Sequence, residues 1–180
     1  ETTAKLPPSL RQEAERLTEI GKRLTFIPQT EAKGFGHAVL LAEKWVGQES
    51  FLLLLGDQLF RTAESRSVSR QVVDLFQAFG DSQSVVGIYE ERLSRVKHYG
   101  TVTGEWVFED TLQIQRLIEK PTEDEALTYL EVARHGKNAF FCVNGIYALR
   151  PALFGILRRH ATGSGGGELQ LTPALDALRE

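Results

Sequence analysis

A carboxylate stands directly after a short apolar run in the first third of the chain. The run covers residues 51–55 and is followed by Gly56 and Asp57. Consecutive apolar residues of this length are typical of a buried strand, and ligands of open α/β sheets bind beyond the carboxyl ends of such strands. Asp57 could hold Mg²⁺ there, because this cation prefers oxygen ligands and bridges to phosphates. The local alternative is an ordinary turn, since Gly and Asp are common turn residues.

A second candidate site is the glycine-containing turn at residues 33–38, with Gly34 and Gly36. These glycines would let the backbone approach a flat ligand closely. The turn is not a dinucleotide-binding fingerprint, because Val39 occupies the place of the last glycine, and it lacks the Gly-Lys-Ser/Thr ending of a P-loop. Together with Asp57, it suggests an α/β domain that handles nucleotides.

A third candidate is the sequence Glu119-Lys120-Pro121, which ends an expected strand. Glu119 could bind sugar hydroxyls, and Lys120 could bind a phosphate as a compact positive charge. The alternative is an exposed ion pair, which contributes little to stability. The histidines of the chain are scattered and show no metal-ligand spacing.

The secondary-structure patterns predict a single α/β domain over residues 1–180. A strand at 51–55, a helix at 68–79 and a strand at 84–89 alternate, which favours a mostly parallel sheet with helices on both faces. The continuous apolar run predicts a first strand buried on both faces. The remaining expected elements are helices at 9–23 (with Ser9 as N-cap), 36–45, 122–134 (with Thr122 as cap), 151–160 and 168–178, strands at 24–27, 99–102, 112–118 and 139–149, and a flexible glycine loop at 162–167.

Composition and charge narrow the function classes. The chain carries 21 Lys and Arg against 24 Asp and Glu, a net charge of −3, which argues against a nucleic-acid-binding protein with its basic patch or stripe. No apolar stretch approaches the roughly 18 residues of a membrane span. The single cysteine, Cys142, excludes an internal disulfide and indicates a cytoplasmic protein. Since the chain contains no methionine, we expect a processed or trimmed piece of a longer polypeptide.

The order of the motifs is more specific than any one of them. Gln29 and the 33–38 turn come first, followed by Gly-Asp at 56–57, His-Tyr-Gly-Thr-Val at 98–102, Ile-Glu-Lys-Pro at 118–121, Val-Asn-Gly-Ile-Tyr at 143–147 and Gly-Gly-Glu-Leu-Gln-Leu-Thr at 166–172. This succession resembles the bacterial-type UTP–glucose-1-phosphate uridylyltransferases of the sugar nucleotidyltransferase superfamily, over most of the chain.

The resemblance implies a Rossmann-like mixed, mostly parallel sheet, truncated here at both ends, with a nucleotide half at about 1–92 and a sugar half at about 93–180. It implies the reaction of UTP with glucose 1-phosphate, dependent on Mg²⁺, and leaves a homo-oligomer open. It assigns the uracil to Gln29 and Gly34, close approach of the sugar to Gly100 and Gly145, the glucose hydroxyls to Glu119, the sugar phosphate to Lys120 and Mg²⁺ to Asp57, with Asp57 and Lys120 as catalytic residues.

Several departures from the family pattern keep alternatives open. No glycine-rich triphosphate loop precedes Gln29, Pro173 stands where the family usually has an acid, and Gly56 replaces the more usual proline. The alternatives are thymidylyl or adenylyl transfer to a sugar phosphate, a non-catalytic domain that binds nucleotide sugars, and a Rossmann-like domain with unrelated chemistry.

Overall fold

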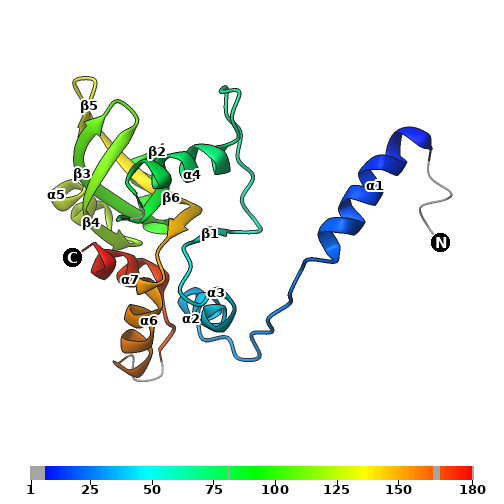
Figure 1. Cartoon of the computed structure of the whole chain (residues 1–180). Helices are drawn as coiled ribbons and strands as arrows, with labels where there is room; N and C mark the ends of the chain where they lie inside the picture. Colours follow the sequence, from blue (N-terminus) through cyan, green and yellow to red (C-terminus); the bar gives the residue numbers. More distant parts are fainter. Residues whose placement is uncertain (1–6, 81, 164–166, 180) are drawn as a thin grey trace. The chain divides into compact units, whose positions relative to one another are not determined.

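The computed structural model describes residues 7–80, 82–163 and 167–179. Contacts between residues divide the chain into two units, Glu1–Thr30 and Glu31–Glu180. Figure 1 shows the helices and strands of each unit. In the described ranges, no helix is both long enough and apolar enough to cross a membrane. The division into a nucleotide half and a sugar half stays a prediction.

The N-terminal unit contains one helix, α1 (Pro8–Gly21), which has no buried residue. This confirms the predicted helix at 9–23, but the helix starts at Pro8, so Ser9 is not its N-cap. Proline suits the first helical position because its missing N–H would have no partner there. The predicted strand at 24–27 is wrong, since these residues have no regular secondary structure. A strand must bond to a second strand, and the described part of this unit contains none.

The larger unit contains a six-stranded sheet and helices that flank it. The strands are β1 (Phe51–Leu54), β2 (Val85–Glu91), β3 (Gly100–Phe108), β4 (Thr111–Glu119), β5 (Val132–Arg134) and β6 (Lys137–Leu149). The helices are α2 (Phe35–Leu41), α3 (Glu43–Val46), α4 (Val68–Ala78), the 3₁₀ helix η2 (Leu93–His98), α5 (Glu123–Tyr129), α6 (Ala152–Gly163) and α7 (Leu171–Leu178). The mixed α/β class is therefore confirmed.

The directions of the strands differ from the expected mostly parallel sheet. Ala148 of β6 pairs with Leu52 of β1 on one side and with Val85 of β2 on the other, both antiparallel. The other recorded pairings, β3 with β4, β3 with β6 and β5 with β6, are antiparallel too. β1 and β2 do run in the same direction, as their connection through α4 predicts, but β6 lies between them. The alternation of strand, helix and strand correctly predicts that β1 and β2 run in the same direction. It does not predict that a third strand lies between them.

Helices cover both faces of β6, as the sequence predicts (Figure 1). Ile146 and Ala148 point to the face on which Phe76 of α4 packs. Tyr147 and Leu149 point to the opposite face, where they join a core cluster with residues of α2, α6 and α7. Because successive side chains of a strand alternate between faces, one long strand forms the centre of both apolar layers.

The first strand is less buried than its sequence suggests. Phe51 and Leu53 pack against the core cluster, whereas Leu52 and Leu54 are 38% and 48% exposed. The expectation that residues 51–55 are buried on both faces is therefore wrong for this strand. A run of apolar residues does not show which of its faces will be covered by other elements.

The expected helix at 122–134 ends early. Thr122 is its N-cap, as predicted, and forms a capping box with Glu125. The backbone N–H of Thr122, followed by its side chain, lowers the pKa of the Glu125 carboxyl by hydrogen bonding. The helix stops at Tyr129, and residues 132–134 instead pair with β6. Long-range pairing thus overrides the local helical preference.

The last expected helix, at 168–178, is also shorter, because α7 starts at Leu171. Residues 168–170 run outside the helix and bond to a distant turn of the chain. Residues 164–166 of the expected glycine loop lie outside the described residues.

Candidate functional site

Glu119 and Gly100 lie opposite each other at the end of β4 and the start of β3. A Cβ atom built on Gly100 would lie 3.3 Å from Glu119 Oε2, 3.0 Å from Thr172 Oγ1 and 3.1 Å from Val143 Cγ2. A side chain at position 100 would therefore occupy the space between a carboxylate and a hydroxyl. The structure brings together two of the residues that the sequence assigned to the sugar, on strands adjacent in the sheet.

Lys120 follows Glu119 in an unusual backbone conformation. Its φ is 47°, in the left-handed region that non-glycine residues rarely adopt. Its N–H donates to the Tyr99 carbonyl at 3.1 Å, which ties this turn to the start of β3. Lys120 Nζ lies 3.8 Å from Glu119 Oε1, and the lysine side chain is 58% exposed. The ammonium is therefore loosely paired and accessible to an anionic ligand.

Tyr147 is a buried neighbour of this carboxylate. Burial raises the pKa of Tyr147 to about 12, and the negative charge of Glu119 adds to the increase. The phenol therefore stays protonated at neutral pH. Tyr147 carried no role in the sequence analysis, although it ends the quoted Val-Asn-Gly-Ile-Tyr motif.

Gly145 positions the loop that carries Asp57. The N–H of Leu55 donates to the Gly145 carbonyl at 2.9 Å. Gly145 has a φ of +78°, and its Cβ would lie 2.9 Å from Gln58 Cγ and 3.2 Å from Leu55 Cβ. The glycine is thus needed for close packing of this loop on β6, and its predicted contact with a sugar stays a prediction. Asp57 itself is exposed.

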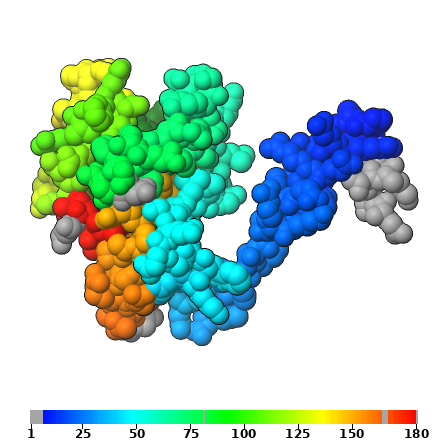
Figure 2. Space-filling model, in the orientation of Figure 1, coloured from blue at the N-terminus to red at the C-terminus, as the bar shows by residue number. Residues whose placement is uncertain are grey.

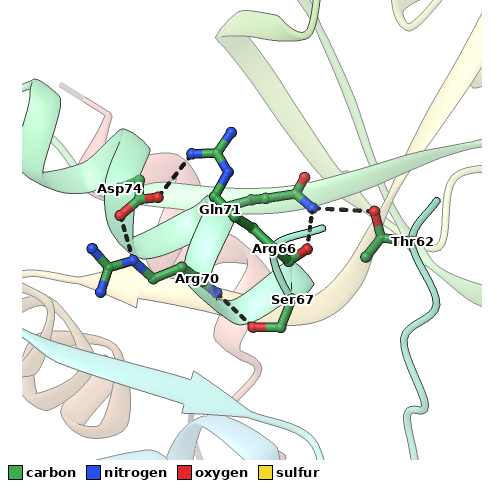
Figure 3. A network of polar contacts seen from close by, with 6 residues as sticks. All are labelled: Thr62, Arg66, Ser67, Arg70, Gln71 and Asp74. Atoms are coloured by element: carbon green, nitrogen blue, oxygen red, sulfur yellow. Dashed lines mark hydrogen bonds and ion pairs between the residues drawn. The ribbon is translucent and has the colours of Figure 1, made fainter. Parts of the chain in front are cut away.

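The far end of the same loop is anchored to α4 by a polar network (Figure 3). Asp74 pairs with Arg66 at 2.9 Å and with Arg70 at 2.7 Å. Gln71 Nε2 donates to Thr62 Oγ1 at 3.1 Å and to the Arg66 carbonyl at 2.9 Å. The loop that carries the candidate metal ligand is therefore fixed at both of its ends.

The predicted metal site contains a single side chain, that of Asp57. No group of three or more His, Cys, Asp and Glu residues that could hold a metal ion occurs in the part of the chain that the structure describes. Asp57 nevertheless suits Mg²⁺, which is commonly bound through one or two carboxylates while phosphates and water supply the remaining oxygens. Asp57 could therefore supply one oxygen to a metal ion whose other ligands are phosphates and water.

The glycines of the 33–38 turn pack against the segment before α7. The Gly36 N–H donates to the Leu169 carbonyl at 2.8 Å, and the Leu169 N–H donates to the Lys33 carbonyl at 2.8 Å. A Cβ on Gly34 or Gly36 would lie 2.7 or 2.8 Å from the Leu169 carbonyl oxygen. The immediate reason for both glycines is therefore this backbone crossing. The predicted contact of Gly34 with a uracil stays a prediction.

Gln29 was also assigned to the base, and it is an exposed residue of the N-terminal unit. Its contact with a base stays a prediction as well.

Two hollows in the surface lie elsewhere. One, of about 590 Å³, is bordered by β2, the β3–β4 hairpin and α7, and the other, of about 460 Å³, by the end of β2 and the start of β6. None of the residues assigned to the site lines either hollow. The candidate residues lie at strand ends, where Lys120 and Asp57 are exposed and Gly100 is buried.

Sequence reasoning missed the contribution of α7. Thr172 is 7% exposed and reaches Gly100, and Leu169 bonds the 33–36 turn. Figure 2 shows the red surface of α7 beside the orange surface of α6. The signal that could have found these residues is the Gly-Glu-Leu-Gln-Leu-Thr motif, which places Leu169 just before α7 and Thr172 in its first turn.

Comparisons with known proteins agree with this architecture. The family model "Nucleotidyl transferase" matches residues 2–180. A UTP–glucose-1-phosphate uridylyltransferase of Pseudomonas aeruginosa is 33% identical over 147 residues, which are 82% of this chain and 48% of that protein. The UTP–glucose-1-phosphate uridylyltransferase YngB of Bacillus subtilis is 32% identical over 169 residues, which are 94% of this chain and 50% of that protein.

Solved structures lead to the same family. A UDP-glucose pyrophosphorylase complexed with UDP-glucose is 29% identical, with a TM-score of 0.78 over 97% of this chain and 62% of that chain. The chain spans about half the length of the curated relatives it matches. The resemblance inferred from the order of the motifs is confirmed, and the chain belongs to the nucleotidyl transferase family.

Proposed function

We propose that this protein transfers a uridylyl group from UTP to glucose 1-phosphate, giving UDP-glucose and pyrophosphate. The observation that carries the proposal is the meeting of Glu119, Gly100 and Thr172 at one point of the structure. A carboxylate and a hydroxyl side by side suit a sugar, because its hydroxyls need hydrogen-bond partners. The names of the relatives support the choice of base and sugar.

The proposed reaction is a displacement at the α-phosphorus of UTP. An oxygen of glucose 1-phosphate forms a bond to this phosphorus, while the bond to the pyrophosphate oxygen breaks and pyrophosphate leaves. The Lys120 ammonium would hold the sugar phosphate and offset its negative charge, and Glu119 would accept hydrogen bonds from glucose hydroxyls. Positioning and charge neutralisation supply most of the acceleration in reactions of this kind.

Asp57 would hold Mg²⁺, and Gln29 and Gly34 would contact the uracil. When bound, the metal would neutralise charge on the triphosphate. The residues that flank Asp57 in the loop, Leu55 and Gln58, pack against Gly145, which supports this position for the carboxylate after β1. The cytoplasmic location and the small-molecule substrates expected from the sequence belong to the same proposal.

A binding panel tests the choice of ligand. The full 180-residue chain is heated with Mg²⁺ and each of UDP-glucose, ADP-glucose, dTDP-glucose and UDP-galactose. A ligand at about 100 times its dissociation constant adds roughly 2.7 kcal/mol to the free energy of unfolding. We expect UDP-glucose to raise Tm most. A larger shift with dTDP-glucose or ADP-glucose would assign another base, and no shift with any ligand would contradict the proposal.

Turnover separates an enzyme from a binding domain. Pyrophosphate release from UTP and glucose 1-phosphate is measured for the chain, for Asp57→Asn and for Asp110→Asn. Asp110 is an exposed acid in the β3–β4 turn and serves as the matched control. We expect Asp57→Asn alone to abolish the Mg²⁺-dependent reaction. Binding of UDP-glucose without turnover would favour the non-catalytic alternative.

A further inference from the structure

One short segment of the chain touches both parts of the candidate site. At residue 169 its backbone forms two hydrogen bonds with the turn that starts at Lys33. Three residues later, Thr172 Oγ1 lies 3.0 Å from a Cβ atom built on Gly100, and Glu119 Oε2 lies 3.3 Å from the same atom. The turn assigned to the base and the strand end assigned to the sugar are thus linked through residues 168–172.

The position of this segment depends on where α7 sits. Asp176, in the last turn of α7, accepts a hydrogen bond from the Leu117 N–H at 2.9 Å through Oδ1. Leu117 lies on β4, two residues before Glu119. The same carboxylate oxygen lies 3.5 Å from Arg179 Nε. The hydrogen bond between Asp176 and Leu117 thus joins α7 to β4, the strand that ends with Glu119.

We propose that Asp176 is a positioning residue, which holds α7 on β4 and thereby sets the distance between the 33–36 turn and Glu119. The inference rests on the proposed function, because it assumes that one ligand contacts both places. Asp176 would act through Leu117 and would not touch the ligand itself.

The packing of α7 allows such an effect to travel. The apolar side chains from Leu169 to Leu175 are almost fully buried: Leu169 5%, Leu171 3%, Ala174 0% and Leu175 7% exposed. Close-packed interiors transmit strain because they contain few voids that could absorb a shift. A displacement of α7 from β4 should therefore also move the backbone of Leu169 and disturb its two hydrogen bonds with the turn.

Four variants isolate the bond. Asp176→Ala removes the acceptor of the Leu117 N–H. If the alanine variant does not fold, Asp176→Ser is used in its place. Asp176→Asn keeps an oxygen at the same place and should behave like the unmodified chain. Arg179→Ala removes only the neighbouring cation, so it shows whether the ion pair contributes.

Hydrogen exchange without ligand tests the structural part. In Asp176→Ala, the amide protons of Gly36 and Leu169 should exchange about tenfold faster than in the unmodified chain, which corresponds to the loss of one hydrogen bond. Asp176→Asn should restore slow exchange. Faster exchange confined to Leu117 and α7 would overturn the proposal, because the effect would then not reach the turn.

Binding of UDP-glucose and of UDP tests the functional part. UDP lacks the sugar, so Asp176→Ala should weaken UDP-glucose about tenfold while UDP changes little. Equal weakening of both ligands would show a merely structural role and contradict the proposal. If the unmodified chain binds neither ligand, the proposed function fails, and the exchange experiment still decides whether Asp176 positions the turn.

Discussion

Gly100 and Glu119 form a cross-strand pair in which a Cβ on the glycine would lie 3.3 Å from the carboxylate oxygen. The other neighbours of that position, Thr172 and Val143, also contribute side-chain atoms. An added methyl group would require these atoms to shift by a few tenths of an ångström. Because they belong to side chains, we expect the fold to tolerate the methyl group and the binding of the ligand to weaken. A substitution at Gly100 should therefore change the affinity for the ligand more than the stability of the fold.

Gly100→Ala should lower the free energy of unfolding by about 1 kcal/mol, at the low end of the cost of overpacking, because the crowded atoms belong to side chains. It should weaken UDP-glucose about tenfold, since Glu119 and Thr172 would have to shift to make room for the methyl group. Urea unfolding and calorimetric titration measure the two effects. Gly155→Ala, in α6, is the control, because its Cβ would meet only arginine side chains at 3.8 Å. Unchanged affinity in Gly100→Ala would count against the sugar site.

Lys120→Gly should stabilise the protein while removing ligand binding. Glycine relieves the left-handed backbone strain of position 120, worth about 1 kcal/mol, but it lacks the ammonium group. His135→Gly is the matched control, because His135 has a φ of 49° and lies in the β5–β6 turn. Both variants should raise Tm, and only Lys120→Gly should lose UDP-glucose binding. Retained binding in Lys120→Gly would remove Lys120 from the site.

Tyr147 should make the protein sensitive to alkaline pH. Its pKa is raised by burial from 10.0 to about 12, so its contribution is fully present below pH 10 and is lost as the pH rises toward 12. The loss amounts to roughly 3 kcal/mol at most.

Urea unfolding between pH 8 and 12 measures this loss, and Tyr147→Phe should flatten the alkaline part of the curve. Tyr89, whose pKa burial also raises, remains in both proteins as a common background. Tyr129→Phe is the control, because Tyr129 is 52% exposed. An identical pH profile for Tyr147→Phe and the unmodified chain would contradict the prediction.

Gly36→Ala should destabilise the larger unit by about 2 kcal/mol, because its Cβ would lie 2.8 Å from the Leu169 carbonyl oxygen, a backbone atom that cannot rotate away. The free energy of unfolding from urea titration measures the change. Gly155→Ala should instead stabilise the protein by about 1 kcal/mol, since it lies within a helix. An unchanged free energy of unfolding in Gly36→Ala would show that residues 168–170 do not pack closely against the turn.

Much of the candidate site was predictable from local sequence. The carboxylates and the lysine follow or end strands whose apolar patterns are visible in the chain, so the sequence alone places Asp57, Glu119 and Lys120 at strand ends. The capping box of Thr122 and the crossover through α4 also follow from local rules, because helix caps and chain direction depend on residues close together in sequence.

The tertiary structure decided which segments became neighbours. Only the fold shows that β6 separates β1 from β2, that residues 132–134 pair with β6 and that Leu52 is left exposed. It also shows that Gly34 and Gly36 are required by the Leu169 backbone, more than 130 residues away. Sequence patterns fix the type of each element through short-range preferences, whereas pairing and close approach depend on contacts between residues that are distant in the chain.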